Sequence, residues 1–113
     1  MNAPSIVDEP VLGVADALEK YAPEQGGIEY QRDQPGKVHS WHSHDLHERL
    51  IVLSGSMLLS WRTSEGEVVS QRAVAGTRIE LPANTVHQST ADDVPCTYLI
   101  YPEGGRAAVT THY

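Results

Sequence analysis

Two histidines separated by a single residue, His42 and His44, are the most chemically informative feature of the sequence. Side chains of a β-strand alternate between its two faces, so both imidazoles would lie on one face, about a metal's span apart. Glu48 stands at an even offset from His44 and returns to that face if the strand continues, whereas His87 lies far along the chain. Three imidazoles and one carboxylate suit Fe(II), Mn(II), Ni(II) or Zn(II), and suit Mg(II) or Ca(II) poorly.

Any one of these residues alone would carry little weight, because an isolated pair of histidines on a strand is more often surface or core than a site. Their spacing, together with two glycines, resembles the first of the two motifs that mark the cupin superfamily. The positions that match are Gly36, His42, His44, Glu48 and Gly55.

The second cupin motif is matched by Gly76, Pro82 and His87, with two departures. Asn84 stands where the motif has a glycine, and Ala91 stands where it has an asparagine. Asparagine tolerates a positive φ better than most other residues, so Asn84 is expected to preserve the turn.

The resemblance covers residues 26 to 102 and implies an all-β fold, an antiparallel double-stranded β-helix of the cupin (jelly-roll) type. It also implies one divalent transition metal ion per chain, Fe, Mn, Ni or Zn. The implied ligands are His42, His44, Glu48 and His87. Four protein ligands on an octahedral ion would leave two positions open for substrate, water or dioxygen.

The pattern of short apolar segments and turn residues points to the same fold class without the motifs. It predicts short strands with no second helix between them, typical of an antiparallel sandwich or barrel. We therefore expect an N-terminal arm and short helix over residues 1–25 and a cupin barrel over 26–113. The predicted strands are 28–31, 38–44, 48–54, 57–62, 67–74, 78–81, 86–89, 97–101 and 109–113.

The predicted strand 48–54 contains Leu50-Ile51-Val52-Leu53, which is apolar on both faces. A strand with one wet face would alternate, so something must cover the outer face. The N-terminal helix, expected to begin near Asp8 and to end at Pro23, is one candidate, and a second subunit is the other. On this basis we expect a homodimer.

Weaker catalytic candidates are His47 and Tyr98. His39 and His47 have the opposite parity to the expected ligands, which places them outside the barrel or at its mouth. Tyr98 would be an acid or hydrogen-bond donor if it lines the barrel, although a core tyrosine is the commoner case.

Composition excludes several classes of partner. The formal net charge of −7 and the scattered basic residues argue against binding to nucleic acid. No segment resembles a membrane span or a secretory signal, and the single cysteine, Cys96, fits a reducing compartment, so we expect a cytoplasmic protein.

Two classes of function remain open. One is an enzyme acting on a small molecule, either as a dioxygenase with iron or as a Lewis-acid isomerase, lyase or hydrolase with Mn, Ni or Zn. The other is a non-catalytic metal- or metabolite-binding module. A purely structural ion is less favoured, because such sites prefer closed sets of four thiolate or imidazole ligands.

Overall fold

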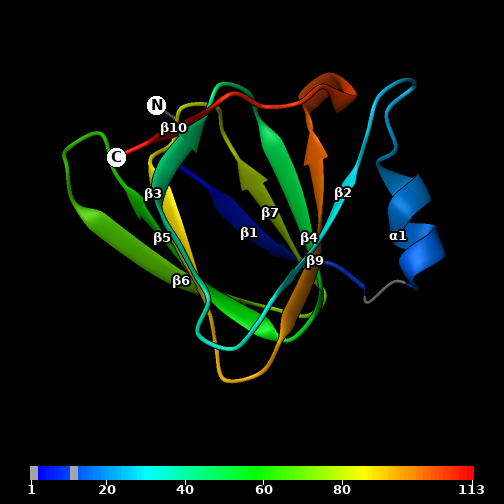
Figure 1. Ribbon diagram of the computed structural model, residues 1–113, viewed down its shortest axis with the longest axis horizontal. Helices are drawn as coiled ribbons and strands as arrows, with labels where there is room; N and C mark the ends of the chain where they lie inside the picture. Colours follow the sequence, from blue (N-terminus) through cyan, green and yellow to red (C-terminus); the bar gives the residue numbers. More distant parts are fainter. Residues whose placement is uncertain (1–2, 11–12) are drawn as a thin grey trace.

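The computed structural model describes residues 3–10 and 13–113, which form two antiparallel five-stranded sheets facing one another around a core (Figure 1). The first sheet has the order β1-β7-β4-β9-β2 and the second has the order β10-β3-β8-β5-β6. In chain order the strands are β1 Ser5–Asp8, β2 Glu29–Asp33, β3 Val38–His44, β4 Glu48–Ser54, β5 Ser56–Arg62, β6 Val68–Val74, β7 Thr77–Leu81, β8 His87–Ala91, β9 Cys96–Pro102 and β10 Thr110–His112.

Successive strands pass from one sheet to the other along most of the chain, since β2 lies in the first sheet, β3 in the second and β4 in the first again. This alternation winds the chain around a common axis and confirms the predicted antiparallel double-stranded β-helix. The core between the sheets follows the pleat of each strand: Ile79 and Leu81 of β7 are buried, and the residue between them is only half-buried. Met57 and Leu59 meet them from β5 of the opposite sheet.

The short helix α1, Val14–Lys20, lies outside the barrel beside β2 and β9 (Figure 1). Seven residues are too few for a helix to be stable by itself, so tertiary packing must hold it. Its buried residue, Ala17, packs on Ile51 of β4 and on Leu99 and Tyr101 of β9. The helix is thus one cover for the outer face of the apolar strand 48–54.

The N-terminal segment is part of the barrel and not the separate arm expected from the sequence. Residues 5–8 pair with β7 as an additional antiparallel strand. The helix begins after Gly13 rather than near Asp8, because Asp8 belongs to that strand. Part of the predicted helical segment, residues 11–12, lies outside the described residues. Over the described ranges, no helix has the length and apolar character needed to span a membrane.

The loop before β8 has the conformation that its sequence predicts. Asn84 has a φ of +65°, the only positive value among the described non-glycine residues. Its backbone N–H donates to the carbonyl oxygen of His44 at 2.7 Å. The asparagine therefore takes the place of the motif's glycine and joins this loop to the end of β3.

Candidate metal centre

Three of the four predicted ligands meet on neighbouring strands of the second sheet. His42 and His44 lie on β3, and His87 begins β8, where it is the direct register partner of His42. The ring centroids are 4.2 Å apart for His42 and His87 and 4.9 Å apart for His42 and His44. One ring nitrogen from each of the three lies within 4.8 Å of the others, so together they could hold a metal ion.

An oxygen atom lies at the Nδ1 atom of each of these imidazoles. The acceptors are the Ser40 carbonyl for His42 at 2.5 Å and the Thr85 carbonyl for His87 at 2.8 Å. A carbonyl oxygen can only accept, so Nδ1 carries the proton in both rings and Nε2 keeps its lone pair. The Nδ1 of His44 lies 3.0 Å from the hydroxyl of Thr110 on β10. Such partners fix the tautomer and orientation of metal-ligating histidines.

Glu48 reaches the same place from β4 of the facing sheet. Its Oε1 lies 3.4 Å from Nε2 of His44, and the residue is 8% exposed. Burial, followed by the nearby charge of Glu29, raises the pKa of the Glu48 carboxyl to about 7. No lysine or arginine of the described ranges pairs with this carboxyl, so its ionised form has no fixed cation to compensate it.

The histidines are held in the form that coordinates metals. Burial, followed for His44 by the charge of His42, lowers the pKa of both His44 and His87 to about 4. Both rings are thus neutral near pH 7, as a ligand must be. Nitrogen ligands about 2.1 Å from an ion lie at most about 4.2 Å apart, so closing the 4.8 Å cluster requires only small ring movements. The donor set fits a divalent transition metal.

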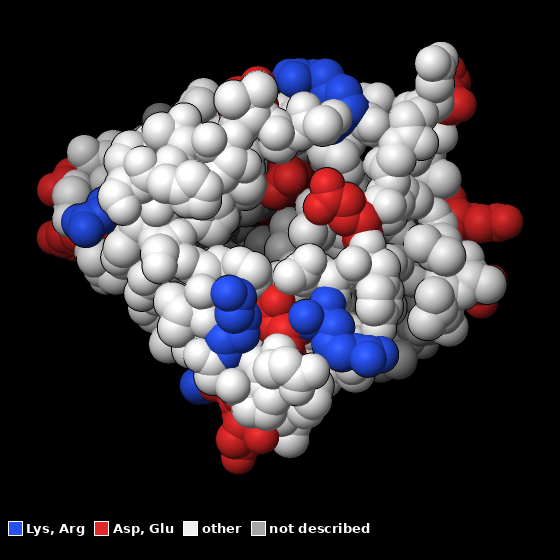
Figure 2. Space-filling model, in the orientation of Figure 1, with Lys and Arg blue, Asp and Glu red and all other residues white. Residues whose placement is uncertain are grey.

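The cluster lies in a cavity of about 230 Å³ between the two sheets. Figure 2 shows the hollow that opens on this face, with acidic side chains beside it. The cavity is below the usual range of about 300–1,000 Å³ for drug-sized ligands, which favours a molecule of few atoms. Its apolar walls are formed by Leu50, Met57, Leu59, Ile79, Leu81 and Ile100, and its other lining residues include Glu29, His39, Ser89, Tyr98, Ala107, Ala108 and Thr110.

His39 also lines this cavity, which contradicts the parity argument made from the sequence. The ladder between β3 and β8 changes register between His39 and His42, and the extra residue in β3 turns His39 to the same face as His42. Its Nε2 lies 3.0 Å from both carboxylate oxygens of Asp33.

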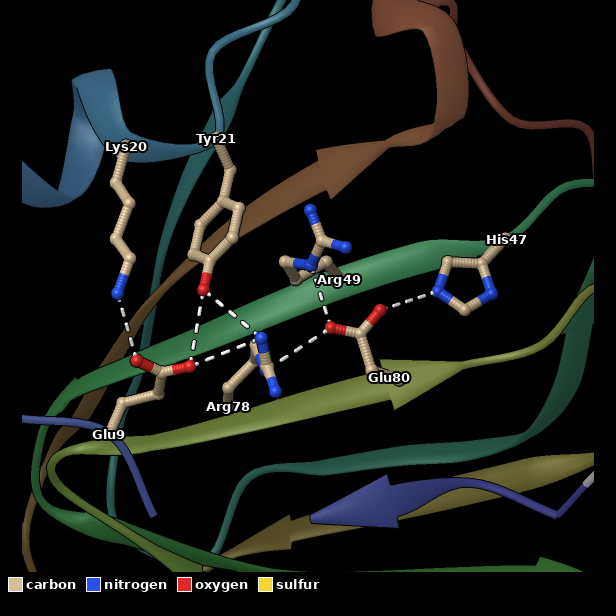
Figure 3. A network of polar contacts seen from close by, with 7 residues as sticks. All are labelled: Glu9, Lys20, Tyr21, His47, Arg49, Arg78 and Glu80. Carbon is tan, nitrogen blue, oxygen red and sulfur yellow. Dashed lines mark hydrogen bonds and ion pairs between the residues drawn. The ribbon is translucent and has the colours of Figure 1, made fainter. Parts of the chain in front are cut away.

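His47, by contrast, lies outside the barrel, as expected. It contacts Glu80 at 2.8 Å, within a polar network that joins the N-terminal segment, α1, β4 and β7 (Figure 3). Arg49 donates to the same carboxylate, and Arg78 bridges Glu80 to Glu9. This network is a structural tie on the outer face of the first sheet.

Tyr98 points into the barrel and lines the cavity, but its hydroxyl already donates to Asp33 at 2.8 Å. Burial, followed by this hydrogen bond, raises the pKa of the phenol. Sequence reasoning missed Asp33, as well as the acceptors at Ser40, Thr85 and Thr110. Near Asp33 the sequence showed only a turn, at residues 33–36. The other three gave no signal in the sequence, because Ser40 and Thr85 accept through backbone carbonyl oxygens and Thr110 reaches His44 only through the pairing of β10 with β3.

No protein-family model and no curated protein matches the sequence. Solved structures do match the fold. A point variant of the oxalate decarboxylase of B. subtilis has a TM-score of 0.71 and 18% identity over 76% of this chain and 23% of its own. Pumpkin seed globulin has a TM-score of 0.66 and 15% identity over 75% of this chain and 23% of its own.

Drosophila melanogaster CENP-C bound to CAL1 matches with a TM-score of 0.63 and 18% identity, over 71% of this chain and 63% of its own. The present chain spans about a quarter of the length of the globulin and decarboxylase structures. Similarity at this level of identity establishes the fold, and the protein has the cupin fold.

Proposed function

We propose that this protein is a metal-dependent cupin enzyme that acts on a small molecule, with one divalent transition metal ion held by His42, His44, Glu48 and His87. The observation that carries the proposal is the arrangement of the three imidazoles. Each has an oxygen at Nδ1, and a ring nitrogen of each comes within 4.8 Å of the others at the wall of the cavity. A structural cluster of histidines would not need one ring nitrogen of each residue to lie this close to the other two.

In this proposal the three Nε2 atoms and the Glu48 carboxylate bind the ion. When bound, the ion would supply a Lewis acid or, in the case of iron, a site for dioxygen. The volume of the cavity, about 230 Å³, admits only a small molecule, and its apolar walls would contact the carbon atoms of that molecule. The Ser40 and Thr85 carbonyls and the Thr110 hydroxyl hold the rings in place.

The donor set supports two reaction classes equally. Iron would favour a dioxygenase, whereas manganese, nickel or zinc would favour an isomerase, lyase or hydrolase. The similarity to oxalate decarboxylase adds only that one protein with this fold is named for a reaction on a small acid.

A second candidate is a non-catalytic metal- or metabolite-binding module. It is supported by the variety of the matching structures, which include a seed globulin and the CENP-C complex with CAL1 as well as an enzyme. One fold can host unrelated functions. Metal uptake without turnover on diketones, thiols or small carboxylic acids would favour this reading.

The decisive experiment is elemental analysis of untagged protein, as purified and after reconstitution with Fe(II), Mn(II), Ni(II) and Zn(II). We expect about one ion per chain in the wild type and a loss of at least about tenfold in affinity in His44→Ala, because a direct ligand is removed. His47→Ala is the matched control and should keep its metal, since His47 lies outside the barrel. Full occupancy in His44→Ala would show that the ligand assignment is wrong.

A further inference from the structure

His39 lines the cavity, and its Nε2 contacts the buried carboxylate of Asp33, which does not line the cavity itself; the metal site uses neither residue. We propose that His39 is an acid–base catalytic residue that takes a proton from an O–H group of the molecule in the cavity, and that Asp33 is its positioning residue. This inference rests on the proposed function. It adds that the substrate is a small molecule with a weakly acidic hydroxyl group.

The register of β3 shows that His39 is turned inward. His39 pairs with Ser89 and His42 pairs with His87, so three steps along β3 correspond to two along β8. Register partners share a face of the sheet, and Ser89 and His87 both line the cavity. A regular strand would have turned His39 to the outside, so the bulge is what brings it to the same cavity as the proposed ligands.

Asp33 holds the ring by one edge. It is 4% exposed and lies 3.0 Å from Nε2 of His39 through both oxygens. It also accepts hydrogen bonds from Tyr98 at 2.8 Å and from Gln31 at 2.9 Å. Burial would raise the pKa of Asp33, but these three hydrogen bonds outweigh it and lower that pKa.

An ionised carboxylate can only accept, so the proton of a neutral His39 is on Nε2 and the lone pair is on Nδ1. Nδ1 lies on the side of the ring away from Asp33. Over the described residues, no hydrogen bond occupies it, and 30% of the side chain is exposed. The titratable groups around the ring are Asp33 and Tyr98, and the cavity shared with His39 also holds His42, His44, His87, Glu29 and Glu48.

The proposed step is a proton transfer. The O–H bond of the substrate breaks, its electron pair stays on oxygen, and the proton forms a bond with Nδ1 of His39. The resulting imidazolium lies beside the Asp33 carboxylate, which compensates its charge. The reverse transfer returns the proton to the product, so His39 ends the cycle neutral.

The competing explanation is that the pair only ties the two sheets together, since Asp33 ends β2 and His39 lies on β3. The variant His39→Gln separates the two roles. A glutamine amide can still donate to Asp33 in place of Nε2, but it cannot accept a proton. His47→Gln makes the same change outside the barrel and is the matched control.

The first measurement is the histidine region of ¹⁵N NMR spectra of the full chain, without metal and loaded with Zn(II). We expect His39 to be the Nε2–H tautomer with an unprotonated Nδ1 in both samples when neutral. Zinc should shift the Nε2 signals of His42, His44 and His87 and leave the tautomer of His39 unchanged. The opposite tautomer, or zinc coordination by His39, would overturn the proposal.

The second measurement is calorimetric titration of the zinc-loaded protein with acetohydroxamic acid, a small weak acid that binds zinc as its anion, in buffers of different ionisation enthalpy. In the wild type and in His47→Gln, the proton that the acid loses on binding should be taken up by His39 and not released to the buffer. His39→Gln should release about one more proton per chain to the buffer. Asp33→Asn should release more than the wild type, because an amide cannot compensate an imidazolium.

The outcomes separate the two proposals. A chain that takes up no zinc overturns the metal site and with it the role of His39. If the wild type binds zinc and acetohydroxamic acid but releases as many protons as His39→Gln does, the role of His39 is overturned and the metal site stands. Thermal unfolding of each variant verifies that it is folded. If His39→Gln cannot fold, the contact between His39 and Asp33 serves to connect the two sheets, and the catalytic role is overturned.

Discussion

At the scale of single residues, the candidate site depends on groups that the motif does not contain. The cupin spacing specifies histidines, whereas the structure shows that a carbonyl or hydroxyl oxygen contacts the Nδ1 atom of each ring. Two of these oxygens belong to the backbone, so mutation cannot remove them directly. The third, the hydroxyl of Thr110, can be removed without changing the shape of the side chain.

Thr110→Val is therefore expected to weaken metal binding by about 10-fold or more, since loss of such a partner commonly costs about 10–100-fold. The neighbouring change Thr111→Val is the matched control, because that residue pairs with Ser43 and has the opposite parity on β10. Competition with a chromogenic chelator measures both affinities. Equal affinities would mean that Thr110 does not orient His44.

At the scale of secondary structure, tight turns decide which strands can pair. Gly55 joins β4 to β5 with a φ of +72°, and a Cβ added there would collide with the carbonyl oxygen of Pro95. Gly66 has a similar φ of +84°, but an added Cβ meets nothing within 4 Å. Both glycines thus have a left-handed φ, but only Gly55 lacks the space for a Cβ atom.

Gly66→Ala should cost about 1 kcal/mol of unfolding free energy, the strain of a left-handed alanine. Gly55→Ala should cost at least about 2–3 kcal/mol, because the backbone of the loop before β9 must also move. Urea denaturation of both variants tests the difference. Similar costs would show that the loop around Pro95 yields easily.

A second prediction at this scale concerns the loop after β8. Asp92 accepts two hydrogen bonds from Arg72 of β6, at 2.8 and 3.0 Å, and one from Ser56 of β5 at 2.6 Å. The bonds from Arg72, followed by that from Ser56, lower the pKa of Asp92 to about 2. A lowered pKa in the folded state stabilises the fold above the unfolded value of 3.8, and this contribution is lost as the pH falls toward 2.

Asp92→Asn should therefore lower the melting temperature at pH 7, and its difference from the wild type should narrow below about pH 4. The adjacent change Asp93→Asn is the control. Thermal unfolding followed by circular dichroism across this pH range measures both. A difference that stays constant with pH would contradict the assignment to the Asp92 charge.

The sequence allowed the strands that carry His42, His44, Glu48 and His87 to be predicted, because motif spacing and alternation both depend on local geometry. It could not predict the inward position of His39. Parity assumes a regular ladder, and the bulge in β3 depends on pairing with β8. The contact between Asp33 and His39 was also out of reach, since it exists only when the two sheets have come together.

At the scale of the whole molecule, α1 changes the argument for self-association. The apolar outer face of β4 suggested a second subunit, but Ala17 and its neighbours already pack against that face. A homodimer remains a proposal that sedimentation at micromolar concentration decides. A monomer would overturn it.

Helix docking itself can be tested with two equal changes on α1. Ala17→Asp buries a carboxylate at a site that is 0% exposed, whereas Val14→Asp places it at a site that is 52% exposed. Ala17→Asp should lower the free energy of unfolding by about 3 kcal/mol or more. It should also increase self-association, because Leu99 and Tyr101 become exposed. Val14→Asp should change both quantities little. Thermal unfolding and sedimentation velocity measure the two effects. Equal behaviour would mean that α1 is not essential to the fold.

The pairing of β10 with β3 has a consequence for the order of events in the cell. His44 lacks its hydroxyl partner until Thr110 has been synthesised and has left the ribosome. The nascent chain can close most of its barrel with the three imidazoles already present, yet one of them is still free to rotate. Tight capture of the ion is thus expected only after β10 has emerged, which delays metal loading until the strands before it have been made.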